Sequence, residues 1–503
     1  MSLFQMTRDE FRRAVAMWGI ALCVFAAASG WVAIRFGQAW SIADLPISSY
    51  VDAIVPAYII MEVAMIPVAS KLTDKFGCKQ LLFAASPIFI LGSLLCIIAP
   101  SVESLAFYRM IQGAGAGLIL GMAFSSVGKF YEPLKRGKCN ELHTAAFAFG
   151  SLFGSAMGYF FTETFNWRAV FVLLSVLMLI GFVIAWRLLP KEEIEDVPMD
   201  NICVVLTALV FGSAALYTQM VNVSFDLISV KSGLSALVII ALTGLLLYRS
   251  YKVNGSPIPT HTSRFEKTMI ILMFMFSLCG LGLIQYFFKL YLTFYEFDIY
   301  KASLMFAVMI AGAACTSMPG VRFVYRTGAK WWIVCGSVIV TIALVLTHFI
   351  ADKGVLQLAI CLFIFGIGLG CIVTEILCSL QLVLPKKDMG QHTGNIIAIR
   401  MVGILAGNAV IGAYINEVIH GGRDTSPIDL YNVDSIIETM KQYIADGLKY
   451  VADSLDSGFL TSALILAFIT GALTILAYTL KKDDVEAARG MEEPEEKTQT
   501  YEE

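Results

Sequence analysis

The chain has 503 residues, of which 58% are hydrophobic and only 15% carry charged side chains, and its formal net charge at pH 7 is -3. Soluble domains carry roughly 25% charged residues, so this composition excludes an ordinary water-soluble protein. No basic stripe interleaved with aromatic residues is present, which argues against a nucleic-acid partner. The eleven cysteines lie singly, mostly inside apolar segments, so we expect neither disulfides nor a metal site.

Apolar residues come in blocks of about 20, the length at which a helix rising 1.5 Å per residue crosses a ~30 Å hydrocarbon core. In chain order the predicted spans are 14–36, 50–70, 81–100, 104–130, 142–164, 168–189, 201–220, 232–250, 268–292, 302–321, 331–350, 355–384, 394–418 and 458–480. The sequence therefore predicts an all-α polytopic protein of the lipid bilayer, with 14 transmembrane helices.

Basic residues are concentrated in alternate loops. They are Arg8, Arg12, Arg13, Lys71, Lys75, Lys79, Lys129, Lys135, Arg136, Lys138, Arg249, Lys252, Arg264, Lys267, Arg322, Arg326, Lys330, Lys386, Lys387, Lys481 and Lys482. The intervening loops carry acidic residues instead. By the positive-inside rule, the basic loops and both termini are predicted to face the cytoplasm, which requires an even number of spans. We expect a multi-pass protein of the bacterial inner membrane.

Two segments are not predicted to span the membrane. The tail 483–503 is polar and acidic and is expected to be disordered. The outer loop 419–457 carries apolar residues at steps of three and four, from Val433 to Leu455, which is the period of an amphipathic helix. We expect this helix to cover the outer mouth or to lie in the headgroup layer. The alternative is a docking site for a partner such as a periplasmic adaptor protein.

The loop after the second span reads SKLTDKFGCK. It resembles the cytoplasmic-loop signature of the major facilitator superfamily, G-x-x-x-D-R-x-G-R-K. The matching residues are Asp74, Lys75, Gly77 and Lys79, whereas Ser70 and Cys78 depart from the signature. Gly77 permits a tight turn, and Asp74 can sit at a helix N-terminus and pair with a cation. The resemblance implies a latch of the cytoplasmic gate; a plain basic loop is the alternative.

A weaker copy of this signature, VRFVYRTGAK, follows the tenth predicted span. It keeps Arg326 and Gly328 and has Tyr325 in place of the acid. A motif that recurs at the matching place in each half is what duplicated six-helix bundles predict.

The fourth span contains LAFYRMIQGAGAG, which resembles the L-x-x-x-R-x-x-Q-G motif of the same superfamily, with Arg109 and Gln112 in register. A charged residue within a span costs at least ~2.5 kcal/mol, so Arg109 is not expected to face lipid unpaired. The resemblance implies an inward-facing arginine linked to proton coupling. The alternative is an arginine satisfied by carbonyls at helix ends.

Glycines at every fourth position of the fifth span, Gly150, Gly154 and Gly158, predict a flat face for close helix packing. They also resemble the antiporter motif of the superfamily, G-x-x-x-G-P-x-x-G-G, although Ser155 replaces the proline and Tyr159 the last glycine. Packing alone would account for these glycines in any membrane protein.

The segment DMGQHTGNIIAIRMVGILAGNAVIGAY, which contains Arg400, resembles span 13 of the fourteen-helix drug:proton antiporters (the EmrB/QacA-like group). That resemblance implies the major facilitator fold with two extra helices between its six-helix halves. We therefore expect an N-terminal six-helix bundle at 1–195, two inserted helices at 196–260 and a C-terminal six-helix bundle at 261–482, which includes the outer loop.

The first span departs from this group, because it lacks the usual aspartate and carries Arg35 instead. Lys289 occupies the corresponding place in the ninth span. These cations are predicted either to reach the outer headgroups or to line a cavity for an anionic or zwitterionic substrate. Candidate cavity residues are Arg35, Lys289, Gln112 and Arg400, and candidate proton-coupling residues are Glu62, Glu375 and Arg109.

These features predict a secondary active transporter working by alternating access. The sequence has no phosphate-binding GxxxxGK[ST] loop, nucleophile elbow or HExxH motif, so we expect neither an enzyme nor a cofactor. Proton-coupled export of a small organic or drug-like compound, as in multidrug efflux, is the favoured function. Proton-coupled transport of an anionic or zwitterionic metabolite, including uptake, is the alternative. We expect a monomer.

Overall fold

The computed structural model describes most of the chain. The described residues are 7–46, 53–190, 192, 197–221, 224, 226–259, 263–281, 305, 308–316, 329–350, 355–384, 389–420 and 448–478. The backbone alone is described at 35–44, 133–134, 155–156, 159, 162–163, 280–281, 350, 355, 382–383, 415–420 and 448–460. Lys289, Arg326, Gly328, most of the outer loop 419–457 and the tail 483–503 lie outside these residues.

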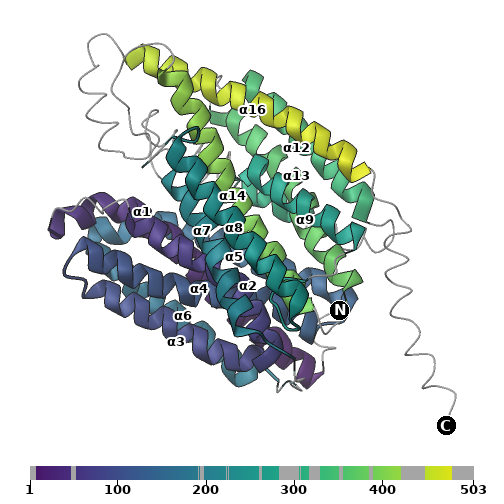
Figure 1. The fold of residues 1–503 in the computed structure, drawn as a ribbon. Helices are drawn as coiled ribbons and strands as arrows, with labels where there is room; N and C mark the ends of the chain where they lie inside the picture. The colour runs from purple at the N-terminus through teal and green to yellow at the C-terminus, as the bar shows by residue number, and fades with distance from the viewer. Residues whose placement is uncertain are drawn as a thin grey trace.

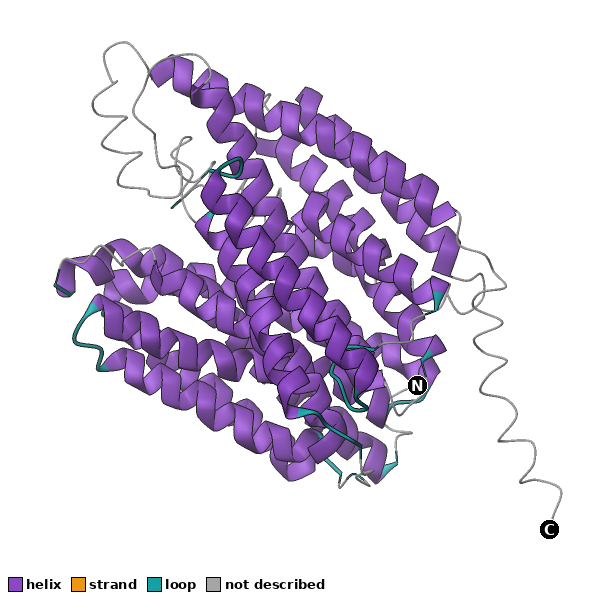
Figure 2. Cartoon of the chain, viewed as in Figure 1, coloured by secondary structure: helices purple, strands orange, loops and turns teal. Residues whose placement is uncertain are grey.

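Nearly all of the described chain is helical (Figure 2). The helices are α1 (Arg8–Asp44), α2 (Ile54–Phe76), α3 (Cys78–Ile97), α4 (Val102–Phe130), α5 (Pro133–Thr164), α6 (Trp167–Leu188), α7 (Asn201–Met220), α8 (Val230–Lys252), α9 (Arg264–Phe276), the π-helix η3 (Ser277–Leu281), α12 (Ala329–Ile350), α13 (Val355–Val383), α14 (Met389–His420) and α16 (Leu448–Tyr478). Eleven of the described helices are long and apolar enough to cross a membrane. The predicted all-α, membrane-spanning class is confirmed.

Three helices extend furthest beyond the predicted spans. The helix α1 runs from Arg8 to Asp44, whereas the predicted span is 14–36. The helix α5 begins at Pro133, about two turns before the predicted start at residue 142, because proline suits the first turn of a helix. The last helix, α16, begins at Leu448, so the end of the predicted outer loop 419–457 continues into the final span. Residues 308–316, within the tenth predicted span, are helical.

Helices α1 to α6 form one group, and α9 to α16 form a second group (Figure 1). Glycines let helices of the first group approach closely. A methyl group added at Gly113 would collide with the carbonyl of Tyr58, and one added at Gly117 would collide with the carbonyl of Glu62. These contacts hold α4 against α2 at backbone distance.

The predicted packing glycines of α5 lie against α1 in the same way. A methyl group added at Gly154 would lie 2.5 Å from the carbonyl oxygen of Ser29, and Gly150 and Gly158 are equally close to neighbouring turns of α1. The Ser29 hydroxyl also donates to the carbonyl of Gly150, at 2.8 Å. Helices α1 and α5 are therefore joined by backbone contact and a buried hydrogen bond.

The two groups meet where α2 and α4 end and where α3, α5 and α14 begin. We call this the basic end of the molecule, after the lysines and arginines of its loops. There α2 and α4 both pack against α14, and a methyl group added at Gly394 would collide with the Ser70 side chain. Figure 1 shows α7 and α8 running between the groups; α7 packs on α2 and α14, and α8 packs on α7.

An ion pair between Asp200 and Arg249 joins α7 to α8. The Arg249 guanidinium donates two hydrogen bonds to the Asp200 carboxylate, at 2.9 and 2.8 Å. Asp200 also caps α7 by accepting a hydrogen bond from the backbone N–H of Cys203 at 2.7 Å. The bonds from Arg249 hold the pKa of the Asp200 carboxyl well below its ordinary value.

We predict that Gly117→Ala destabilises the protein by roughly 1–3 kcal/mol, because the added methyl group would collide with the α2 backbone. The matched control is Gly244→Ala on α8, where no atom lies within 4 Å of the new methyl group. That change should be neutral, or stabilising by up to about 1 kcal/mol from helix propensity. The measurement is thermal unfolding of the purified protein. An unchanged melting temperature for Gly117→Ala would contradict the prediction.

Candidate functional site: a polar latch and buried charges

The end of α2 holds the first turn of α14. Asp74 lies in the last turn of α2, before the sharp turn at Gly77, whose φ of +84° favours glycine. Its carboxylate accepts a hydrogen bond from the backbone N–H of Gln391 at 3.0 Å. That N–H lies in the first turn of α14, where backbone N–H groups have no acceptor within their own helix. Asp74 therefore caps a helix of the other group, and the α14 dipole favours its negative charge.

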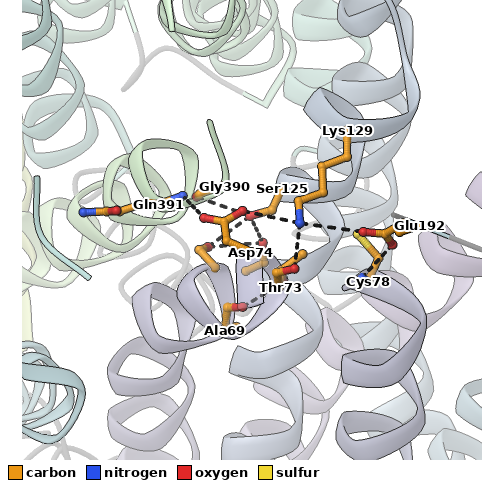
Figure 3. A network of polar contacts seen from close by, with 11 residues as sticks. Ala69, Thr73, Asp74, Cys78, Ser125, Lys129, Glu192, Gly390 and Gln391 are labelled. Atoms are coloured by element: carbon orange, nitrogen blue, oxygen red, sulfur yellow. Dashed lines mark hydrogen bonds and ion pairs between the residues drawn. The ribbon is translucent and has the colours of Figure 1, made fainter. Parts of the chain in front are cut away.

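Lys129, in the last turn of α4, connects Asp74 to Glu192, which follows α6 (Figure 3). Its ammonium lies 3.5 Å from Asp74 Oδ1 and 3.7 Å from Glu192 Oε2, and it donates to the carbonyl of Thr73 at 2.6 Å. Glu192 in turn accepts from the backbone N–H of Cys78 at 2.7 Å. A chain of charge-assisted contacts thus runs from the residues after α6 to the start of α14. We call Asp74, Lys129, Glu192 and Gln391 the latch.

Small side chains allow the latch to close. Gly390 lies directly against the Asp74 carboxylate, where a side chain would collide. Ser125 Oγ lies 3.1 Å from Ser70 Oγ and 3.4 Å from the carbonyl oxygen of Gly390. Ser70, at the position of the signature's glycine, is therefore accommodated by hydrogen bonding to Ser125.

The other residues of the predicted gate motif lie beside the latch. The Lys79 ammonium donates to the carbonyl of Leu189 at 3.2 Å, and Lys75 lies 5.7 Å from the ring of Phe76. Sequence reasoning counted Lys129 only as a loop charge and did not identify Glu192 or Gln391. Their positions at the end of α4, after α6 and at the start of α14 were the available signal, but nothing in the sequence pattern indicated that these residues meet.

A second set of contacts joins the groups at the same end. Arg136 of α5 donates to the carbonyl of Gln381 of α13 at 2.5 Å. The Asn140 amide donates to Gln381 Oε1 at 2.6 Å, and the Gln381 amide lies 3.3 Å from the Thr393 hydroxyl of α14. Helices α5, α13 and α14 are therefore tied together by hydrogen bonds between polar, uncharged groups and one arginine.

Arg109 is enclosed within the first group of helices. Its guanidinium donates to Gln112 Oε1 at 2.6 Å and to the carbonyl of Gly30 at 2.9 Å, and it lies 4.2 Å from the ring centroid of Tyr58. Gln112 is positioned by its own hydrogen bond to Ser93, at 2.7 Å. A carbonyl, an amide and an aromatic face together compensate this buried cation.

The two candidate carboxylates have no such partners. Glu62 of α2 is 2% exposed and its Oε1 has no hydrogen-bond partner; Glu375 of α13 is fully buried and neither of its oxygens has one. Arg109 acts electrostatically on Glu62, but no hydrogen bond or ion pair joins the two among the described residues.

The candidate cations are less fully described. Arg400 of α14 is 9% exposed and its Nε has no hydrogen-bond partner. It shares a helix face with Thr393 and Met389, which contact the other helices of the basic end, and lies roughly three turns from Met389. Arg35 lies in α1 where the backbone alone is described, and Lys289 is outside the described residues.

A sequence model described as Major Facilitator Superfamily matches residues 16–407, well over half of the chain. The chain belongs to the major facilitator superfamily. It is similar to the multidrug transporter protein MdtP of Bacillus subtilis, with 23% identity over 90% of this chain and 84% of the relative. A shorter stretch, 30% of each chain, is 31% identical to the multidrug export protein EmrB of Haemophilus influenzae.

Solved structures share the fold at low sequence identity. The human organic anion transporter MFSD10 aligns with a TM-score of 0.61 and 12% identity, covering 94% of this chain and 100% of that one. The proton:xylose symporter XylE aligns with a TM-score of 0.60 and 13% identity, covering 94% and 98%. The major facilitator fold expected from the sequence is confirmed, and the protein is a transporter and not an enzyme.

We predict that Asp74→Asn loosens the latch without unfolding the protein. Loss of a charge-assisted hydrogen bond costs about 1.5–3 kcal/mol, so hydrogen exchange in residues 389–395 should accelerate roughly tenfold or more. Asp226→Asn, in the exposed turn before α8, is the matched control and should change nothing. Hydrogen exchange measured by mass spectrometry tests this; equal protection in both variants would contradict the role of Asp74.

Proposed function

We propose that this transporter works by alternating access and exports a small organic or drug-like compound in exchange for protons. The observation that carries the proposal is the kind of contact between the two helix groups. Within each group the helices touch backbone to backbone, whereas at the basic end the groups are joined by the latch and by the polar contacts of Arg136, Asn140 and Gln381. When the two helix groups separate, water can replace each partner in these hydrogen bonds.

The proposal includes the arrangement of the protein in its membrane. We propose the division into bundles at 1–195 and 261–482, joined by inserted helices at 196–260, as in the fourteen-helix drug:proton antiporters. The basic end faces the cytoplasm of a bacterial cell, by the positive-inside rule. The protein acts as a monomer, and the outer loop 419–457 is a lid or a docking site for an adaptor.

The proposed coupling ion is a proton carried by Glu62 or Glu375. A buried carboxylate without a partner is costly when charged and much less so when neutral, so its protonation state responds to the exposure of the site. Export of drug-like compounds is supported by the similarity to MdtP and EmrB, which are named for multidrug transport.

A second candidate substrate class is supported by Arg400. Its buried guanidinium has an unpartnered Nε and shares the face of α14 that meets the other helix group at the basic end. A buried guanidinium with an unpartnered N–H attracts an anion. We therefore retain an anionic or zwitterionic metabolite as the alternative substrate, with uptake or export as the direction.

We predict that Glu62→Gln or Glu375→Gln abolishes accumulation of ethidium driven by a pH gradient while exchange of ethidium continues. Exchange requires the loaded site to reorient, but it does not require a proton to be released. Proteoliposomes with an imposed pH gradient provide the measurement, with Glu132→Gln, an exposed carboxylate at the start of α5, as the control. If both variants still concentrate ethidium, another group carries the proton or the coupling ion differs.

The two substrate classes predict different results for Arg400→Gln. If the substrate is anionic, fluorescein transport should fall at least tenfold while ethidium transport changes little, because the guanidinium attracts only the anion. The same comparison applies to Arg35→Gln and Lys289→Gln. Equal losses of both dyes would remove the support for an anion site, and initial rates in proteoliposomes provide the measurement.

A further inference from the structure

Two carboxylates from opposite helix groups lie at the seam between α5 and α13. Glu141 follows Asn140, whose amide lies 3.8 Å from the thiol sulfur of Cys378; Glu375 is less than one turn from Cys378. Glu141 is eight residues from the start of α5 and Glu375 is eight from the end of α13, so both lie about 12 Å from the basic end. Glu141 acts electrostatically on Glu375.

This part of the seam is buried, and several of its acceptor oxygens have no hydrogen-bond partner. Glu141 is 7% exposed and Glu375 is fully buried. Both oxygens of Glu375 and Oε1 of Glu141 have no hydrogen-bond partner, and neither does the buried Oδ1 of Asn140. Ser379 Oγ, one turn along α13 from Glu375, is also unpartnered. Ionised carboxylates and an amide oxygen only accept hydrogen bonds, and the Ser379 hydroxyl offers a single donor, so a proton on one carboxyl adds a donor that these oxygens lack.

The charges on neighbouring elements do not neutralise the pair. Lys138 of α5 is the cation that acts on Glu141, and it is exposed; no described cation acts on Glu375. Arg136 donates to the Gln381 carbonyl nearer the basic end. The Cys378 and Cys371 thiols of α13 interact with Glu375 but supply no positive charge. His143 contacts Phe124 of α4, Glu266 of α9 approaches His392 of α14, and Arg400 acts on neither carboxylate.

We propose that Glu141 and Glu375 form a proton-binding site shared by the two helix groups, occupied while the basic end is closed. Two buried carboxylates that interact across α5 and α13, with no described cation acting on Glu375, cannot both be ionised, so the pair holds at least one proton. The inference rests on the proposed alternating access and assigns Glu375 a partner on the other half.

Opening the basic end releases the proton. Water enters between α5 and α13, a carboxyl O–H bond breaks, and water accepts the proton and leaves a carboxylate behind. The two carboxylates then repel each other, and the seam closes again only after one of them is protonated. High pH on this side therefore favours the open seam and low pH favours the closed one. If this end is cytoplasmic, the released proton moves inward, as proton-driven export requires.

The test is the separation of the helix groups at the basic end as a function of pH, without substrate. Nitroxides are attached through bio-orthogonal amino acids at Gln80 of α3 and Lys267 of α9, both exposed. Pulsed electron paramagnetic resonance of the full-length protein in lipid nanodiscs then gives the ratio of open to closed seams. Each proton released on opening should raise this ratio by up to tenfold per pH unit between pH 5.5 and 8.5.

Variants assign the response to the pair. The double variant Glu141→Gln/Glu375→Gln replaces neutral carboxyls with amides of the same shape, so its seam should stay closed at every pH. Glu132→Gln, at the N-cap of the same helix but exposed, should respond as the wild type does. A wild-type ratio that does not change with pH, or a pH response retained by the double variant, would overturn the inference.

Chemical labelling of the wild-type protein tests the pair without depending on the folding of any variant. Dicyclohexylcarbodiimide reacts with protonated carboxyls in apolar surroundings, so Glu141 or Glu375 should be modified more at pH 6 than at pH 8.5; equal or absent modification would also overturn the inference. A flat pH response with intact gradient-driven ethidium accumulation would reject the pair and leave the transport proposal standing. Loss of accumulation with an intact pH response would reject proton-driven export alone.

Discussion

Burying a charge away from water costs several kcal/mol unless a partner compensates it, and this cost organises the polar interior of the protein. The compensated charges are structural. Arg109 is surrounded by a carbonyl, an amide and an aromatic ring, and Asp74 is held between Lys129 and the backbone of α14. Each such set fixes the position of at least two helices.

The uncompensated groups have a different distribution. Asp74 Oδ1 and Arg109 Nε also lack hydrogen-bond partners, but other atoms of these two side chains are bonded. Among the described contacts no side-chain hydrogen bond or ion pair involves Glu62, Glu141, Glu375 or Arg400, and all four are at least nine-tenths buried. Glu141 and Glu375 come from the two sides of the seam between the helix groups. A proton, a substrate or a second conformation would supply the hydrogen-bond partners that these buried groups lack.

The contacts between helices of one group also differ from the contacts between the two groups. Glycines bring α4 to within backbone contact of α2, and those of α5 do the same with α1, so separating these helices would break extensive packing. At the seam, the contacts of Asp74, Arg136 and Gln381 are directional and polar, and water can replace them. The close backbone contacts within each group therefore differ in kind from the polar contacts of Asp74, Arg136 and Gln381 between the groups.

The sequence by itself determined the helical class, the family and the approximate position of most spans, because blocks of about 20 apolar residues have one stable solution in a bilayer. It also indicated Asp74, since the loop signature is local. It could not supply Gln391, which lies 317 residues from Asp74 along the chain, or the groups around Arg109, which come from three other helices and its own. Glu141 was missed because the apolar pattern starts at residue 142, whereas α5 starts at Pro133 and carries that carboxylate into the seam. Periodicity and hydropathy report the environment of one helix at a time. Only the tertiary structure decides which side chains of different helices share a dry space, and hence which buried charges are matched.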